Sequence, residues 1–187
     1  MDGKDIRFQK IITGIKTRDL AVQEQIYKSY WGYLMAVCLR YLNDRDVAME
    51  VVNDSFIKAF KIIFDFRFDD DGEVAHKMFK SWLTKIAVRT ALDSLRSKRS
   101  YLSYTDDYQE VPEDYVAVES KLHAADILSL LEEIPDLHRT VFNLYEIEGF
   151  SHEEVSGMLK IPASSSRTYL TRAKMKLREL YKIKMES

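Results

Sequence analysis

Arginine, threonine and lysine side chains recur at helical spacing near the C-terminal end of this 187-residue sequence. Guanidinium groups make paired hydrogen bonds to base edges or phosphates, hydroxyls bond either, and ammonium groups neutralise phosphates. Residues 160–184 contain eight basic residues against a single acid, Glu179. The pattern predicts a surface that contacts duplex DNA, with these candidate residues off the apolar line of one helix: Ser164, Ser165, Arg167, Thr168, Thr171, Arg172 and Lys174.

A helix-turn-helix over residues 149–177 would position these side chains. Ser151 and Glu154 have the spacing of a capping box, in which each side chain satisfies a free backbone N–H at a helix start. Pro162 predicts the break after this helix, because proline lacks an N–H and clashes with the preceding turn. A second helix then follows, and its cap is expected at one of three serines, Ser164, Ser165 or Ser166. An amphipathic surface helix with a solvated charged face is the alternative for the second segment alone.

Composition favours a helical, folded chain. Hydrophobic residues make up 46% of the sequence, which is enough to build buried cores, and the six glycines and three prolines are few for a protein rich in turns. No segment shows the alternation of a strand, so we expect an all-α fold. Cys38 is the only cysteine, which excludes an internal disulfide and a cysteine zinc site.

Targeting signals are also missing from the sequence. The first ten residues have no apolar signal-peptide core, and no apolar run approaches the roughly 18 residues that span a bilayer. We therefore expect a cytoplasmic protein without membrane insertion.

Charge is distributed unevenly along the chain, although the net charge is only −2. Residues 77–99 carry seven basic side chains against Asp93, whereas residues 102–120 carry six acids and no Lys or Arg. The acidic stretch also contains Pro112 and shows no sustained period, which is typical of a linker. We expect two small helical domains at 1–100 and 121–187, joined by an acidic linker at 101–120, with the helix-turn-helix in the second.

Helical periodicity places the remaining elements. Apolar stripes predict helices over 19–42, from Asp44 to about residue 64, and from about Trp82 to residue 98. The segment 65–76, with three adjacent acids before a glycine, predicts a loop. In the second domain, helices are expected over 122–134 and 137–147, and Gly149 is expected to stop the latter.

Taken together, the segments resemble the extracytoplasmic-function (ECF) group of bacterial sigma factors from about residue 19 to residue 181. Residues 48–60, AMEVVNDSFIKAF, match the run A-E-D-L-V-Q-E-T-F-x-R-A-W. Residues 82–99, WLTKIAVRTALDSLRSKR, match W-L-x-x-I-A-x-N-x-x-x-D-x-L-R-R-x-R. Residues 134–156, IPDLHRTVFNLYEIEGFSHEEVS, match L-P-x-x-x-R-x-V-F-x-L-x-x-x-x-G-x-S-x-x-E-I-A. The three motifs occur in the order of that family.

The resemblance implies a subunit that binds core RNA polymerase and directs it to promoter DNA. The first domain would dock on polymerase through Glu50, Asn53, Asp54 and Phe56. It would contact the −10 element through a second set of residues, namely Lys85, Arg89, Arg96, Lys98 and Arg99. The helix-turn-helix residues would contact the −35 element, and an anti-sigma protein is an implied partner. Ser166 stands where the family commonly has a buried valine.

Enzymatic chemistry is not predicted. The four histidines are scattered without a metal-ligand spacing, and there is neither a phosphate-binding glycine loop nor a nucleophile elbow. His152, Glu153 and Glu154 are interpreted as a solvated turn. We expect no cofactor and no metal.

Two other hypotheses compete with a promoter-recognition subunit. A free-standing helix-turn-helix regulator would leave the motifs at 48–60 and 82–99 unexplained. A sigma-like decoy that binds a regulatory protein without touching DNA would have lost its basic surfaces, and both basic segments are present.

Overall fold

The computed structural model describes residues 14, 19–42, 44–67, 69, 71–97 and 130–186, and within these ranges every regular element is helical. The predicted all-α class is confirmed. The chain divides into two compact units, Met1–Lys98 and Arg99–Ser187. The expected linker at 101–120 and most of the expected helix at 122–134 lie outside the described residues.

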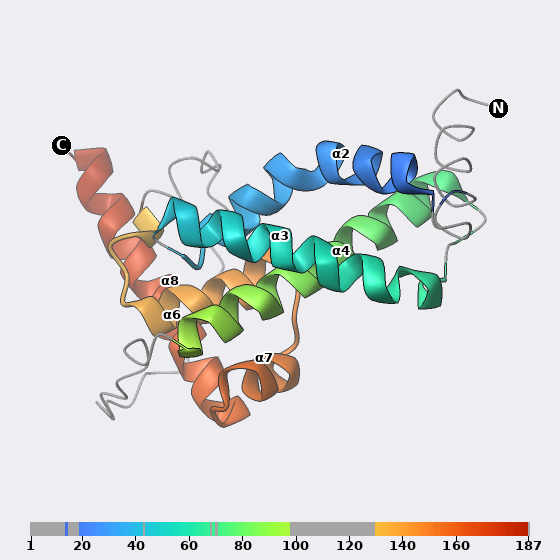
Figure 1. Cartoon of the computed structure of the whole chain (residues 1–187). Helices are drawn as coiled ribbons and strands as arrows, with labels where there is room; N and C mark the ends of the chain where they lie inside the picture. Colours follow the sequence, from blue (N-terminus) through green and yellow to red (C-terminus); the bar gives the residue numbers. More distant parts are fainter. Residues whose placement is uncertain are drawn as a thin grey trace. The chain divides into compact units, whose positions relative to one another are not determined.

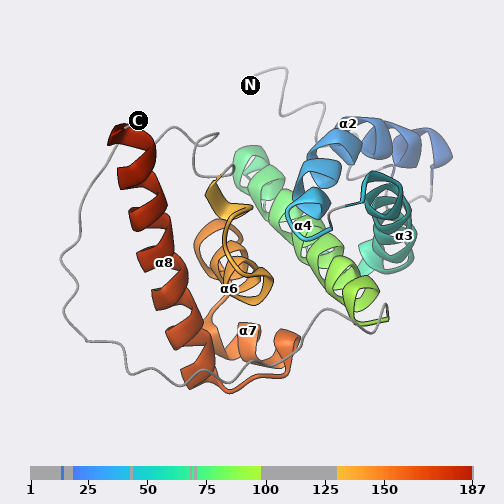
Figure 2. The ribbon, with the colours of Figure 1, turned by 90° about the vertical axis from the view of Figure 1, so that its left-hand side faces the viewer.

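The first unit consists of three long helices, α2 (Leu20–Leu39), α3 (Arg45–Ile62) and α4 (Gly72–Ser97). A short 3-10 helix, η1 (Ile63–Asp65), follows α3. Each long helix packs against the other two (Figures 1 and 2). Burial of large apolar side chains stabilises this arrangement by roughly 1.5–3 kcal/mol for each before entropy is counted. The fully buried members include Ile26, Leu34, Val52, Phe56, Phe79 and Leu83.

An aspartate caps the start of each of these three helices. Asp19 accepts a hydrogen bond from the backbone N–H two residues later at 2.8 Å. Asp44 and Asp71 each accept two such bonds, at 2.9 and 3.1 Å and at 2.8 and 3.1 Å respectively. A side-chain cap is worth about 1 kcal/mol, because it satisfies donors that the helix itself cannot pair. The helix start predicted at Asp44 is confirmed.

The loop predicted over 65–76 is wrong in its second half, because α4 already begins at Gly72. Asp69 accepts a hydrogen bond from the N–H of Asp71 at 2.9 Å, and Asp71 in turn caps α4. The acids before the glycine therefore start a helix instead of prolonging a loop. His76 lies inside α4 and not in a connection.

The second unit contains α6 (Asp136–Phe142), the π-helical turn η2 (Asn143–Ile147), α7 (His152–Leu159) and α8 (Ala163–Glu186). The helix predicted over 137–147 is thus an α-helix that widens into a π-turn. In Figure 2, α6 lies alongside α8 and α7 lies at the N-terminal end of α8, in agreement with their contacts. The core of this unit is formed by Val141, Leu144, Phe150, Val155, Leu159, Leu170 and Ala173.

Gly149 ends the π-turn, as expected from the sequence. Its φ of +75° lies in the left-handed region, where a side chain would strain the backbone. The reversal lets the N–H of Phe150 donate to the carbonyl of Leu144 at 3.0 Å. Phe150 is thereby directed into the core.

Candidate nucleic-acid interface

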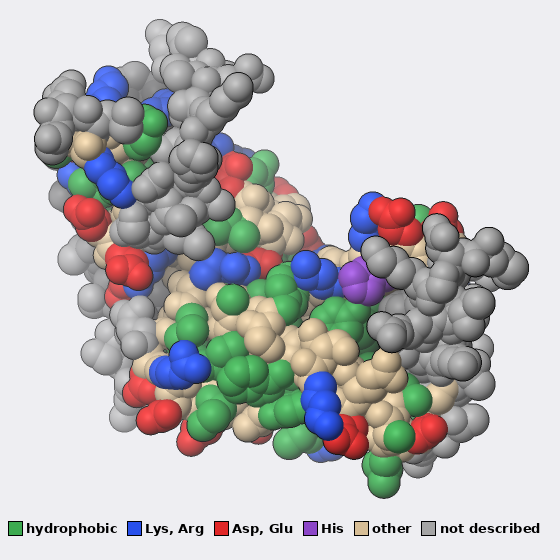
Figure 3. Space-filling view, turned by 90° about the horizontal axis from the view of Figure 1, so that it is seen from above, with side chains coloured by type: hydrophobic (Ala, Val, Ile, Leu, Met, Phe, Trp, Pro, Cys, Tyr) green, Lys and Arg blue, Asp and Glu red, His purple; other side chains and the backbone are tan. Residues whose placement is uncertain are grey.

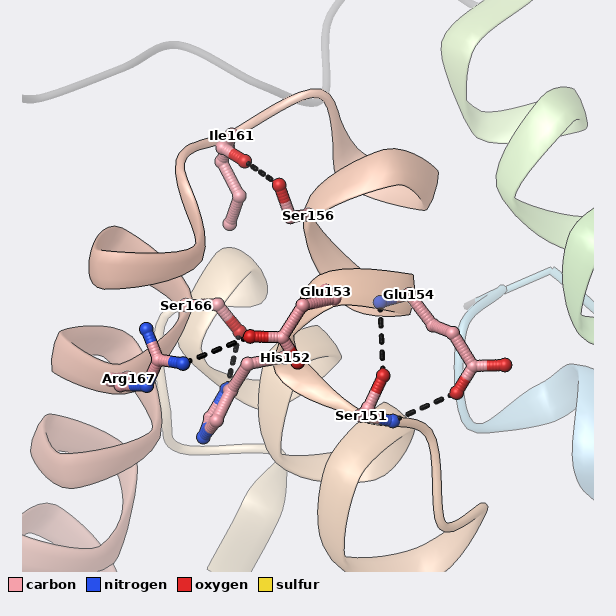
Figure 4. Close-up of polar contacts among 8 residues, drawn as sticks. All are labelled: Ser151, His152, Glu153, Glu154, Ser156, Ile161, Ser166 and Arg167. Carbon is pink, nitrogen blue, oxygen red and sulfur yellow. Dashed lines mark hydrogen bonds and ion pairs between the residues drawn. The ribbon is translucent and has the colours of Figure 1, made fainter.

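A capping box starts α7, as predicted from Ser151 and Glu154. The Ser151 hydroxyl accepts from the Glu154 N–H at 3.2 Å, and the Glu154 carboxylate accepts from the Ser151 N–H at 2.9 Å (Figure 4). Both donors at this helix end are therefore satisfied reciprocally. The position of α7 is fixed at its first turn.

The turn between α7 and α8 is built from a left-handed residue and a side-chain hydrogen bond. Lys160 has a φ of 56°, and the Ser156 hydroxyl donates to the carbonyl of Ile161 at 2.6 Å (Figure 4). Ile161 is buried beneath the turn. These contacts fix the conformation of the short turn that connects α7 to α8.

The expected serine cap of the second helix is wrong. α8 begins at Ala163, so the three serines lie within its first turn. The carbonyl of Pro162 accepts the first helical bond, from the N–H of Ser166 at 3.1 Å. Proline fixes φ near about −65° and has no N–H to satisfy, so the chain enters the helix without a side-chain cap.

The outer side of α8 carries the candidate DNA-contacting residues. Leu170 and Ala173 are buried on the inner side of the helix. The Thr168 hydroxyl donates to the carbonyl of Ser164 at 3.1 Å, so one of the candidate hydroxyls is already bonded within the helix. The structure places the following outside the core, either exposed or half-buried: Ser164, Ser165, Arg167, Thr168, Thr171, Arg172 and Lys174.

Two of these cations are bound by acids from other elements, which the sequence analysis did not find. Arg167 pairs with Glu153 of α7 at 2.9 Å (Figure 4), and Lys174 pairs with Glu146 of η2 at 2.6 Å. Both pairs join residues far apart in sequence, so helical spacing gives no signal for them. The flank of α8 that faces these acids is therefore partly neutralised.

His152 is wrongly interpreted as part of a solvated turn. Its Nδ1 lies 2.9 Å from the hydroxyl oxygen of Ser166, which is fully buried, and the Tyr145 ring stacks on the imidazole at 4.3 Å between centroids. Burial and, secondarily, the positive charge of Arg167 lower the pKa of His152. The polar contact explains how a serine occupies a position that is commonly an apolar one.

His138 has a similar environment on the other flank of α8. Its ring lies 5.1 Å from that of Tyr169, centroid to centroid. Burial and the nearby charge of Arg172 lower its pKa. The environments of His138 and His152 therefore both favour the neutral imidazole.

The second basic surface lies on α4. Lys85, Arg89 and Arg96 fall on one side of the helix, because spacings of four and eleven residues return to nearly the same direction. Arg96 pairs with Asp93 at 2.9 Å. The other two candidates, Lys98 and Arg99, lie outside the described residues. Towards the N-terminal end of α4 the same side carries the exposed apolar residues Val74 and Met78.

The candidate polymerase-binding residues of α3 separate into two groups. Glu50, Asn53 and Asp54 are exposed on the outer side. Phe56 is only 2% exposed, so its assignment to a docking surface is wrong for this structure. Its ring lies 4.8 Å from that of Tyr27, and the helical spacing that exposes Glu50 and Asp54 turns Phe56 inward. It supports the outer side of α3 from within the core.

Ile57 is the residue of α3 that the sequence analysis missed. It is 53% exposed and lies three and four residues after Asp54 and Asn53, so it shares their side of the helix. More generally, the face of the molecule drawn in Figure 3 shows hydrophobic side chains at the surface, with scattered basic and acidic ones between them. The helical spacing of an isoleucine among polar residues would have been the signal.

Two features of the described ranges bear on other functions. In these ranges, no group of three or more His, Cys, Asp or Glu side chains is arranged to hold a metal ion. Nor does any of the helices described combine the length and the apolar character that a bilayer crossing needs.

Two family models match the chain, "Sigma-70 region 2" over residues 26–101 and "Sigma-70, region 4" over residues 124–177. The chain is a sigma-70-type sigma factor. It belongs to the ECF group. Several curated ECF sigma factors align with it along nearly its whole length. As a sigma factor, it directs promoter-specific initiation by RNA polymerase. The match at 26–101 covers both motifs that a free-standing regulator would leave unexplained.

Relatives support the same assignment. This sigma factor is 24% identical over 167 residues to the ECF sigma factor SigM of Bacillus subtilis, covering 84% of this chain and 94% of SigM. It is 26% identical over 180 residues to the ECF sigma-E factor of Haemophilus influenzae, covering 89% and 90%. Among solved structures, its fold is similar to sigma factor RpoE of Bartonella quintana, with a TM-score of 0.50 at 20% identity over 86% of this chain and 96% of that one.

Proposed function

We propose that α8 contacts the −35 element, that α4 contacts the −10 element, and that the outer side of α3 docks on core RNA polymerase. The observation that carries the proposal is the α7–turn–α8 geometry. The capping box and the Lys160 turn hold α8 with Arg167, Thr171 and Arg172 directed away from its core. A helix presented in this way enters the major groove with its early residues at the base edges.

The α4 surface suits a DNA strand that is being melted. Lys85, Arg89 and Arg96 form a basic line along one side of the helix. Unstacking a base costs a few kcal/mol, which contacts between a basic groove and the strand offset. Near that line, Trp82 is half-buried against Phe66, with 5.0 Å between their ring centroids. We infer that this part of α4 stabilises the opened −10 strand.

The outer side of α3 combines negative charge with an exposed apolar residue. Glu50 and Asp54 precede Ile57 on the same side of the helix, and Asn53 accepts a hydrogen bond from the Tyr27 hydroxyl at 3.0 Å. Interfaces of this kind have an apolar centre and a polar rim that steers association. A partner surface with basic residues around an apolar pocket would complement it.

The remaining parts of the proposal follow from the role of a specificity subunit. The chain catalyses no reaction itself, needs no cofactor, and acts in the cytoplasm, where the polymerase and the chromosome are. The RpoE structure of Bartonella quintana is a complex with the anti-sigma factor NepR. We infer that an anti-sigma protein also binds this chain and holds it inactive.

Co-elution with core RNA polymerase tests the docking surface. The double variant Glu50→Lys/Asp54→Lys should elute separately from core polymerase, with affinity lowered by about tenfold or more, since reversed charges repel a basic partner. The charge-matched control is Glu132→Lys/Glu133→Lys, which changes two exposed acids of the second unit. The control should co-elute as the parent does. Far-UV circular dichroism verifies that both variants remain helical.

The same purified complex tests the function as a whole. Transcription from genomic fragments should start at discrete positions only when the chain is added to core polymerase. Equal co-elution of the α3 variant and its control would remove α3 from the interface. Duplex binding by the chain without any association with polymerase would support a free-standing regulator instead.

A further inference from the structure

An ion pair links the two helices of the DNA-binding motif. The Nη2 of Arg167, in the second turn of α8, lies 2.9 Å from the Oε1 of Glu153 in α7 (Figure 4). The two side chains are 56% and 68% exposed. The pair therefore lies at the surface and on the side of α8 that the proposed function directs at DNA.

Stability does not explain this pair. Exposed ion pairs contribute about 0–1 kcal/mol, because water screens them and two long side chains must be ordered. The contacts that join α7 to α8 lie elsewhere, in the part-buried His152–Ser166 contact and in the packing of Val155 and Leu159. The consequence of the pair concerns what the guanidinium of Arg167 can bind.

The geometry of arginine allows one edge to be held while another stays available. Guanidinium carries five N–H donors in a planar fork, and the hydrogen bond to Glu153 uses a donor on Nη2. A base edge is uncharged and can accept from the remaining donors. A phosphate that approaches Arg167 must also approach the carboxylate of Glu153, and like charges repel. The pair thus favours a base contact over a phosphate contact.

We propose that Glu153 is a positioning residue that orients Arg167 towards a base edge and weakens its binding to phosphates. It thereby raises the ratio of promoter binding to non-specific binding. Phosphate contacts supply most of non-specific affinity and carry no sequence information, so suppressing one of them sharpens selection. The inference rests on the proposed role of α8 at the −35 element.

Glu153→Gln tests the proposal, with Glu179→Gln as the matched control. Glu179 also pairs with a cation of α8, Lys176, at 2.9 Å, and its removal changes the net charge equally. Each full-length variant is assembled with core RNA polymerase. Its Kd is measured by fluorescence anisotropy at several salt concentrations for a promoter fragment from which the complex initiates, and for a fragment of shuffled sequence and equal length.

For Glu153→Gln we expect affinity for the shuffled fragment to rise about threefold while promoter affinity stays level or falls, so the ratio drops by about threefold to tenfold. For the shuffled fragment, the slope of the logarithm of affinity against the logarithm of salt concentration should steepen by about 0.9, the value for one added phosphate contact. For Glu179→Gln, affinity for both fragments should rise alike and the ratio should not change.

Three results would decide against these assignments. The positioning role of Glu153 is overturned if Glu153→Gln leaves the ratio of promoter affinity to shuffled-fragment affinity unchanged, or gives the same ratio as Glu179→Gln. An equal fall in both affinities also overturns it, because that is the signature of a structural role. Arg167→Ala is measured alongside: if it leaves promoter affinity at the parental value, then the proposed −35 contact itself is wrong.

Discussion

The basic residues of α4 and α8 that we propose as DNA contacts are alike in type and differ in how they are held. On α4, Arg96 pairs with Asp93 three residues earlier, within the same helix. On α8, Arg167 and Lys174 pair with acids contributed by α7 and η2. The first arrangement is local, and the second depends on the packing of the unit.

Tertiary neighbours therefore set how available a DNA-binding cation is. A pair at a spacing of three or four contributes a few tenths of a kcal/mol and forms in any helix with that sequence. A pair between elements forms only after α7 has been capped and packed on α8. Disrupting the second unit should therefore change the α8 surface while leaving the α4 surface as it is.

The largest effect is expected from Phe150→Ala. Phe150 is 1% exposed, and its truncation leaves a cavity that should lower the free energy of unfolding by about 3–5 kcal/mol. Both tryptophans, Trp31 and Trp82, lie in the first unit. Urea denaturation should therefore show a shifted far-UV circular dichroism transition and an unshifted tryptophan fluorescence transition. Equal shifts in the two signals would mean that the two units unfold together. The α4 surface would then not be independent of the second unit.

The next largest effect is expected from variants of the two basic helices, each of which should weaken binding to a different DNA fragment. Arg167→Ala/Arg172→Ala should weaken binding to a duplex −35 fragment by about 1–3 kcal/mol per arginine, without affecting association with polymerase. Lys85→Ala/Arg89→Ala should leave binding to that fragment unchanged. This variant should instead weaken binding to a fragment with an unpaired −10 segment. Both are measured on the assembled complex by fluorescence anisotropy. If both variants lost binding to the same fragment, α4 and α8 would not have separate roles.

A smaller effect is expected from pH in the second unit. Burial lowers the pKa of His138 and His152 in the folded state, so the unfolded chain binds more protons below about 6.5. Their contribution is present above that pH and is lost as pH falls, so the Tm of the second unit should decrease between pH 7.5 and pH 5.5. His138→Phe/His152→Asn should reduce this decrease. A Tm that falls as steeply in the double variant would exclude these histidines as its cause.

Most of the fold could be predicted from local signals. Apolar periodicity located α2, α3 and the C-terminal half of α4, and the capping box at Ser151 fixed the start of α7. The errors lie at helix starts. Asp71 was counted as part of a loop although it caps α4, and the start of α8 was assigned to a serine although Pro162 alone suffices. Both sites hold several residues capable of capping, so residue type alone does not say where the helix begins.

The candidate site was predicted less completely. The resemblance to the family implied all four docking residues of α3, of which Glu50, Asn53 and Asp54 are exposed and Phe56 is buried in the core. Helical spacing would have placed Ile57 beside Asn53 and Asp54, but it was not applied to the docking residues of this helix. A motif match assigns positions and does not distinguish a surface side chain from the buried one that supports it.

Several features of the protein follow from the amino-acid sequence without knowledge of the packing: the helical class, the caps at Asp44 and Ser151, the stop at Gly149, and the side of α8 that carries its arginines. These depend on dihedral preferences, on hydrogen bonds over three or four residues and on helical period, all of which are local. By contrast, the pairing of Glu153 with Arg167, the pairing of Glu146 with Lys174 and the contact of His152 with Ser166 depend on how the helices pack. The physical reason is that an ion pair or hydrogen bond needs its atoms within about 3 to 4 Å, and for residues on different helices only packing sets that distance.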